Sequence, residues 1–193
     1  MQIALDTLSR LARAFERHPP PRVKALHLPP VPWNGSKDGE FGAVELASGA
    51  LGLSYLLLDD TLARIGATGA GVAGADPLQL ARLWAEGGTP AERALGFAAV
   101  NALSRELFDR AGFVPPAATD SIGGLDPQPG ESIGMVGFFQ PLMKPVLARG
   151  AQLTVLELRA DLAGPRDGFA VTLDPADLAG CTQVLCTSTV LLN

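Results

Sequence analysis

The sequence of 193 residues carries a formal charge of −5 and is 47% apolar and 18% charged. This length suffices for one large domain or two small ones with a buried apolar core. The acidic balance argues against a nucleic-acid-binding protein, because no surplus of Lys and Arg is present to neutralise phosphates. The 22 glycines and 16 prolines are dispersed between apolar segments, which is typical of a loop-rich globular protein.

Several features predict a soluble, cytoplasmic protein. No apolar run approaches the roughly 18 residues that a membrane span requires. The N-terminal segment lacks a basic region and carries Asp6 early, so no signal peptide is expected. The two cysteines, Cys181 and Cys186, are too few for a disulfide framework.

The first part of the chain predicts an α+β domain over residues 1–116, a three-stranded meander with helices. Apolar residues at three- and four-residue spacing over 8–15 indicate a first helix. Strand-like stretches follow it over 23–28, 43–47 and 51–58. Asp76, followed by a proline, begins a second helix, and a capping box at Thr89 and Glu92 begins a third.

The second part of the chain, residues 117–193, begins with a proline-rich linker and has a different pattern. Strands are predicted over 133–139, 153–157, 169–173 and 183–187, with helices at 141–149 and 174–177. Apolar runs that alternate with helices are typical of parallel strands covered on both faces. We therefore predict a Rossmann-like α/β domain with the strand order 3-2-1-4.

Ligands of such sheets bind beyond the carboxyl ends of the strands, where the strand order reverses. The residues expected at that edge are Gly137, Phe138, Glu157, Thr187, Ser188, Thr189 and Asn193. Hydroxyl and amide groups there would orient an anionic or chelating ligand.

Two of these groups have a simpler alternative. Glu157 lies 23 residues after Gly134, near the spacing at which an acid binds a ribose diol, and it could also bind a cation. The alternative is a solvated acid paired with Arg159. The hydroxyls of residues 187–189 suit a phosphate or carboxylate, or they form an ordinary polar loop.

The glycines argue against a dinucleotide site of the NAD type. Gly134-x-x-Gly137 differs from the G-x-G-x-x-G pattern, and two phenylalanines follow where a pyrophosphate needs bare backbone. The alternative role for these glycines is close packing of helix and strand. The cofactor therefore stays open, with a divalent metal or a metal complex as the candidates.

Other candidate residues favour structural interpretations. His18 lies at a helix end and His27 in a strand, and the spacing of Cys181 and Cys186 is not that of a zinc or redox motif. No Ser-His-Asp signature, H-E-x-x-H motif or Walker loop is present, so no catalytic residue is assigned. Asn101, in the middle of a helix, either ties that helix to the sheet or lines a cleft between the domains.

Four segments together resemble a prokaryotic family of putative heavy-metal chelation proteins, a domain of unknown function. They are ERALGFAAVNA (92–102), GMVGFFQP (134–141), LTVLE (153–157) and TSTVLLN (187–193). The resemblance covers essentially the whole chain. It implies an enolase N-terminal-like domain followed by a Rossmann-like domain, with a site in the cleft between them.

The sequence also departs from the family pattern. The turn Gly137-Phe138-Phe139-Gln140-Pro141 differs from the family's Gly-x-Phe-Pro, and Thr187-Ser188-Thr189 replaces Thr-Gly-Ser-Thr. Family members continue past the position of Asn193, so we expect a truncated Rossmann-like domain. Its last strand would then be an open apolar edge, which a second copy of the chain or another polypeptide is expected to cover.

The sequence leaves two main hypotheses for function. The first is binding of a small anionic molecule or metal complex in the cleft, lined by the residues of the carboxyl edge and by Asn101. The second is a non-catalytic assembly protein that has lost part of the Rossmann-like domain. A nucleotide-dependent or methyltransferase-like enzyme is a weaker third hypothesis. Neither nucleic acid nor a membrane is expected as a partner, whereas a homo-oligomer is.

Overall fold

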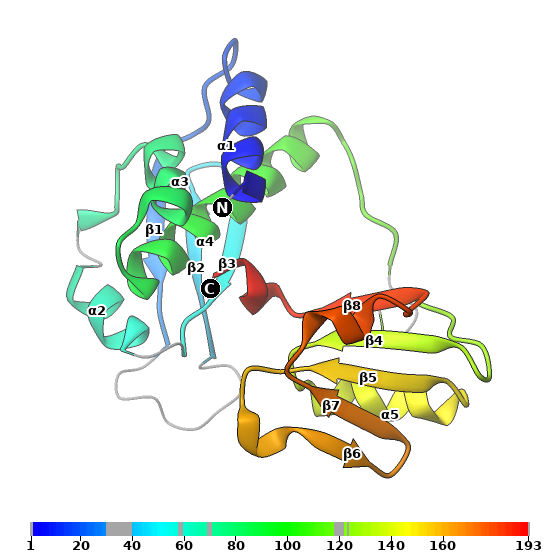
Figure 1. Ribbon diagram of the computed structural model, residues 1–193. Helices are drawn as coiled ribbons and strands as arrows, with labels where there is room; N and C mark the ends of the chain where they lie inside the picture. The colour runs from blue at the N-terminus through cyan, green and yellow to red at the C-terminus, as the bar shows by residue number, and fades with distance from the viewer. Residues whose placement is uncertain are drawn as a thin grey trace. The chain divides into compact units, whose positions relative to one another are not determined.

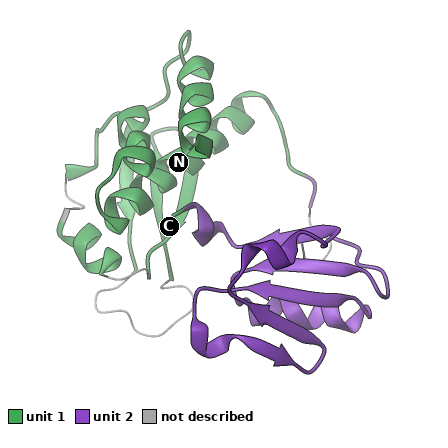
Figure 2. Ribbon diagram, viewed as in Figure 1, with its two compact units in different colours: residues 1–115, 192–193 green, residues 116–191 purple. Residues whose placement is uncertain are grey.

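The protein folds into two compact units (Figure 2). The computed structural model describes residues 2–29, 40–57, 60–68, 71–117, 122 and 124–192. Unit 1 comprises residues 1–115 and 192–193, and unit 2 comprises residues 116–191. Among the described residues, no helix combines the length and apolar character that a membrane crossing requires.

The described residues of unit 1 form an antiparallel three-stranded sheet and four α-helices (Figure 1). The strands, in the order β1-β2-β3, are β1 (Val23–His27), β2 (Phe41–Leu46) and β3 (Leu51–Tyr55). The helices are α1 (Gln2–Ala14), α2 (Thr61–Thr68), α3 (Pro77–Glu86) and α4 (Pro90–Arg110). The predicted meander is present, whereas α2 was not predicted.

Helix α4 is the central element of unit 1. It begins at the predicted capping box, where Thr89 Oγ1 accepts from Glu92 N and Thr89 N donates to the Glu92 carboxylate. One apolar cluster packs α4 against the sheet, and a second packs it against α1 and α3. Leu192, only 2% exposed, lies in the second cluster, and its carbonyl accepts a hydrogen bond from Arg93.

Glycines allow the neighbours of α4 to approach its backbone. A Cβ at Gly96 would lie 2.1 Å from Trp84 N in α3, and a Cβ at Gly52 in β3 would lie 2.0 Å from Ala102 N. Both distances are far shorter than a van der Waals contact, and the atoms met are rigid backbone atoms, so neither position has room for a side chain.

A buried carboxylate fixes the C-terminal part of α4. Glu106, 5% exposed, accepts hydrogen bonds from Ser48 Oγ and from Arg110 Nε. Arg110 also donates to the carbonyls of His18 and Pro19. This network joins α4 to the β2–β3 turn and to the segment after α1.

Unit 2 contains a five-stranded mixed sheet in the order β6-β7-β5-β4-β8. The strands are β4 (Ser132–Val136), β5 (Gln152–Leu156), β6 (Gly164–Arg166), β7 (Phe169–Thr172) and β8 (Gln183–Cys186). β7, β5, β4 and β8 are parallel, so the predicted order 3-2-1-4 is present, and an unpredicted β6 adds antiparallel to β7.

The two faces of this sheet are covered differently from the prediction. Helix α5 (Gln140–Ala148) covers one face with Met143 and Val146. On the other face the predicted helix is a short 3₁₀ segment, η4 (Pro175–Leu178). There a Cβ at Gly134 would lie 3.2 Å from Leu178 Cδ2, so this glycine permits close packing. Two further 3₁₀ segments are η3 (Ala160–Leu162) and η5 (Ser188–Leu191).

We predict that Gly52→Ala lowers the free energy of unfolding of unit 1 by about 3 kcal/mol, because the methyl group would overlap the backbone of α4. Both tryptophans lie within residues 1–115, so urea unfolding followed by tryptophan fluorescence reports on this unit. Gly71→Ala is the control, since nothing lies within 4 Å of a Cβ there. Equal effects of the two substitutions would contradict the packing described.

Candidate functional site

The carboxyl ends of three parallel strands lie side by side in unit 2. β4 pairs with both β5 and β8. The turn at Gly137 and Phe138 follows β4, Glu157 follows β5, and residues 187–189 follow β8. Backbone hydrogen bonds continue past the strands, with Gly137 N donating to Leu156 O at 2.9 Å and Thr187 N to Val136 O at 3.1 Å. The structure thus brings these predicted residues to one edge of the sheet.

Strand β4 ends at Val136, three residues before the end of the predicted strand at residue 139, and Gly137 begins the turn that follows. Its φ of +93° lies in the left-handed region, which glycine adopts without strain. A Cβ at this position would also lie 2.7 Å from Thr187 Cγ2. The turn therefore needs a glycine for two reasons, and Thr187 lies directly against it.

Glu157 holds this turn through backbone hydrogen bonds. Its Oε1 accepts from Phe138 N at 3.1 Å, while Oε2 accepts from Leu158 N at 2.6 Å and Arg159 N at 3.3 Å. Burial raises the pKa of Glu157, but the three hydrogen bonds outweigh burial and hold the pKa below its usual value. The carboxylate is therefore charged at neutral pH.

The alternative in which Glu157 pairs with Arg159 is not present as an ion pair between these two described residues, although the charge of Arg159 also lowers the pKa of Glu157. The guanidinium of Arg159 instead pairs with Asp161, with Nη2 at 2.6 Å from Oδ2. Arg159 contributes its backbone N–H to Glu157 instead.

Three hydroxyls follow β8 in sequence. Thr187 Oγ1 and Thr189 Oγ1 lie 3.2 Å apart and share a hydrogen bond. Ser188 is exposed, and its hydroxyl has no hydrogen-bond partner among the described residues. Hydroxyls of this kind can turn their protons toward an anion or their lone pairs toward a cation.

The remaining two predicted residues are Asn101 and Asn193. Asn101 lies in unit 1, where its Nδ2 donates to Leu53 O at 2.8 Å and thereby joins α4 to β3. Asn193 lies outside the described residues.

The described residues do not assemble a direct metal site. Among them, no group of three or more His, Cys, Asp and Glu side chains is arranged to hold an ion. His27 Nε2 lies 2.8 Å from Glu45 Oε2, and Lys24 Nζ lies 2.7 Å from Glu45 Oε1. Hydrogen bonds from Lys24 and His27 hold the pKa of Glu45 below its usual value. Burial raises the pKa of the Cys181 thiol, which disfavours the thiolate that binds metal.

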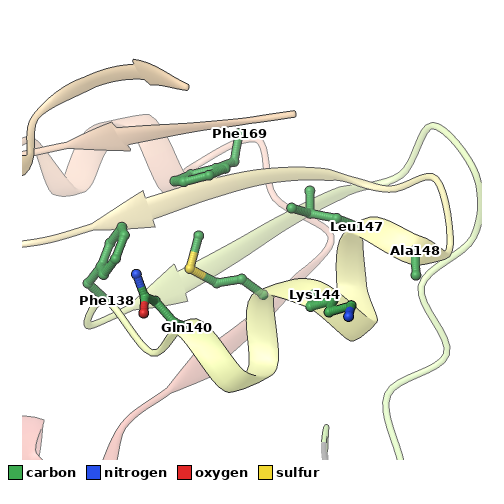
Figure 3. Close-up of a pocket in the computed structure, with 7 residues that line it drawn as sticks. Phe138, Gln140, Lys144, Leu147, Ala148 and Phe169 are labelled. Atoms are coloured by element: carbon green, nitrogen blue, oxygen red, sulfur yellow. The ribbon is translucent and has the colours of Figure 1, made fainter. Parts of the chain in front are cut away.

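A groove that sequence reasoning missed lies between α5 and β7 (Figure 3). Its volume is about 520 Å³. Its lining residues are Phe138, Gln140, Met143, Lys144, Leu147, Ala148 and Phe169. Phe138 was predicted at the carboxyl edge of the strands and as an obstacle to a pyrophosphate, not as part of this groove. Helix α5 begins at Gln140, one residue before the predicted helix, so the four-residue spacing of Gln140 and Lys144 places both on one face of α5.

Two family models match the chain. Residues 121–193 match DUF364 and residues 40–104 match DUF4213, and both families are described as "Putative heavy-metal chelation". Each of the two matched segments is thus similar to one of these families. No curated protein matches the chain significantly.

Two crystal structures of DUF364 proteins of unknown function are similar in fold. That from Desulfitobacterium hafniense DCB-2 has a TM-score of 0.59 and 16% identity, and that from Pyrococcus horikoshii has a TM-score of 0.57 and 17% identity. Each match covers 97% of this chain and 69% of the other. At this identity the likeness concerns the fold alone.

We predict that Glu157→Gln speeds hydrogen exchange by about tenfold either at the amide of Phe138 or at the amides of Leu158 and Arg159, because the single oxygen of the amide group can accept from only one of the two turns. NMR-detected exchange measures this directly. Asp161→Asn is the control, since it removes a nearby carboxylate that accepts none of the three amides.

The same variant isolates a pH dependence. The folded pKa of Glu157 lies below that of the unfolded chain, so its stabilisation is present above the unfolded value of about 4.3 and is lost as the pH falls through the folded value. The extra stability of the wild type over Glu157→Gln should therefore shrink on acidification below about pH 4.3. A difference that stays constant down to pH 2 would contradict this role.

Proposed function

We propose that unit 2 binds a small anionic molecule or an anionic metal complex at the carboxyl edge of its parallel strands. The observation that carries the proposal is the cluster of hydroxyls from Thr187 to Thr189 beside the Gly137 turn. Parallel sheets of this topology bind ligands at the carboxyl ends of their strands, where the strand order reverses.

The donor chemistry supports a complex rather than a bare metal ion. Soft heavy metals select thiolate and imidazole ligands, and the described residues contain no cluster of such groups. Hydroxyls and backbone N–H groups instead suit the oxygen atoms of an anion. In this proposal the metal is cargo, and the chain recognises the organic acid that chelates it.

The fold assignments implied by the resemblance belong to the same proposal. An enolase N-terminal-like unit 1 is supported by the antiparallel β1-β2-β3 sheet with its helices, and a Rossmann-like unit 2 by the parallel order β7-β5-β4-β8.

We predict that Thr187→Val and Thr189→Val each weaken binding of the Ni²⁺–citrate complex by about tenfold, because each removes a hydroxyl hydrogen bond to a charged ligand. Isothermal titration calorimetry measures the affinity, with Ni²⁺ alone and citrate alone as separate titrants. Thr182→Val is the matched control, because Thr182 immediately precedes β8, beyond the opposite end of the strand. Unchanged affinity in both variants, or equally tight binding of Ni²⁺ alone, would overturn the proposal.

A second candidate function, assembly with another chain, is favoured by the contrast between the two edges of the same sheet. The β6 edge reads Gly164-Pro165-Arg166, and proline and charge protect an edge from pairing. The β8 edge reads Gln183-Val184-Leu185-Cys186, with Val184 47% exposed. In this alternative, a strand of a second polypeptide pairs with β8.

For this alternative we predict that the chain self-associates and that Val184→Lys reduces self-association, because a charged side chain disfavours pairing at an edge. Size-exclusion chromatography with light scattering over a range of concentrations measures it. Ala170→Lys, which adds the same charge on the exposed position of an interior strand, is the control. A monomeric wild type at all concentrations would contradict the prediction.

A further inference from the structure

The groove of unit 2 between α5 and β7 has the size of a small-molecule site. Its volume of about 520 Å³ falls within the range of about 300–1,000 Å³ that is usual for ligand pockets. Phe169 and Val171 alternate with exposed Ala170 along β7, so Phe169 lies on the face of the sheet that α5 covers, where Val171 packs in the core.

Aromatic and thioether side chains line the apolar part of the groove. The rings of Phe138 and Phe169 have centroids 6.2 Å apart and are inclined by 49°. Met143, 5% exposed, adds a polarisable sulfur close to the core. Inclined ring faces of this kind offer edge and face contacts to a further planar ring.

The polar part of the groove carries one charge and no acid. Lys144 is the only charged residue among the lining residues, and Gln140 lies one turn before it on α5 (Figure 3). Lys144 is exposed, and its side chain has no ion pair or hydrogen bond with any other described residue. A ligand that matches these lining residues would have a flat apolar group for the aromatic rings and a negative charge for Lys144.

We propose that this groove binds a planar aromatic carboxylic acid. The ring packs against Phe138 and Phe169, and the carboxylate pairs with Lys144 while Gln140 donates an amide hydrogen bond. Glu157 and the hydroxyls after β8 do not line this groove. The inference is therefore separate from the carboxyl-edge site, with which it shares only Phe138, whose backbone N–H binds Glu157 and whose ring faces the groove.

The experiment compares two probes of the same shape, 2-naphthoate and the neutral 2-naphthalenemethanol, on the full chain by NMR titration. We expect naphthoate to bind with a Kd of about 1 mM or tighter, a value typical of a ligand of this size, with shifts at Phe138, Phe169 and Lys144. The neutral alcohol should bind more weakly, because it lacks the charge that pairs with Lys144.

Three variants test the contacts. Lys144→Gln should weaken naphthoate binding by about fivefold, the upper range for an exposed ion pair, and leave the alcohol unaffected. Lys144→Arg should retain the naphthoate affinity. Ala148→Trp, on an exposed position of α5 that lines the groove, should fill the space and abolish binding of both probes.

Controls separate this inference from loss of fold and from the proposed function. Arg82→Gln, which removes an exposed charge on α3 in unit 1, should leave naphthoate binding unchanged, as should Thr189→Val. Thermal unfolding midpoints of the variants show that each one folds. Absence of saturable binding, undiminished binding to Ala148→Trp, or equal effects of Lys144→Gln on both probes would overturn the proposal.

Discussion

The carboxylate of Glu157 is the interaction on which the carboxyl edge of unit 2 depends. One of its oxygens accepts from the turn after β4 and the other from the turn after β5. Hydrogen bonds to an ionised acceptor are stronger than those between neutral groups, so a single side chain fixes two adjacent loops. The turn that it holds contains Gly137, against which Thr187 packs, and the end of β8 is thereby placed as well.

This arrangement gives the groups at the edge different roles. Both carboxylate oxygens of Glu157 accept hydrogen bonds from backbone N–H groups, and these bonds stabilise the two turns. The hydroxyl of Ser188 has no partner among the described residues, and the hydroxyls of Thr187 and Thr189 bind each other. Both carboxylate oxygens of Glu157 are thus engaged by backbone donors, whereas in the part of the chain that the structure describes the Ser188 hydroxyl is not.

Signals within a few residues of the sequence predicted much of the fold. The capping box at Thr89 predicted the start of α4. The alternation of apolar runs with helices predicted parallel strands, with the order 3-2-1-4 expected of a Rossmann-like sheet. Features that depend on the conformation of one residue were not predicted. β4 ends at Val136 because Gly137 adopts a positive φ, although the apolar run in the sequence continues beyond Gly137. β6 reads Gly-Pro-Arg, a composition that no strand rule selects, and only pairing with β7 makes it a strand.

The candidate site was predictable as a location but not as a set of contacts. Parallel strands must end at the same edge, so the sequence could bring Glu157 to the residues after β8. When two acids lie at the same distance in sequence from a base, the path of the backbone decides which of them forms the ion pair. Arg159 is two residues from both Glu157 and Asp161, and it pairs with Asp161. The aromatic groove is harder still to predict, because Phe138 and Phe169 meet only when α5 leaves part of its sheet face open. A side chain that the sequence places as an obstacle to a pyrophosphate thus lines an apolar groove in the fold.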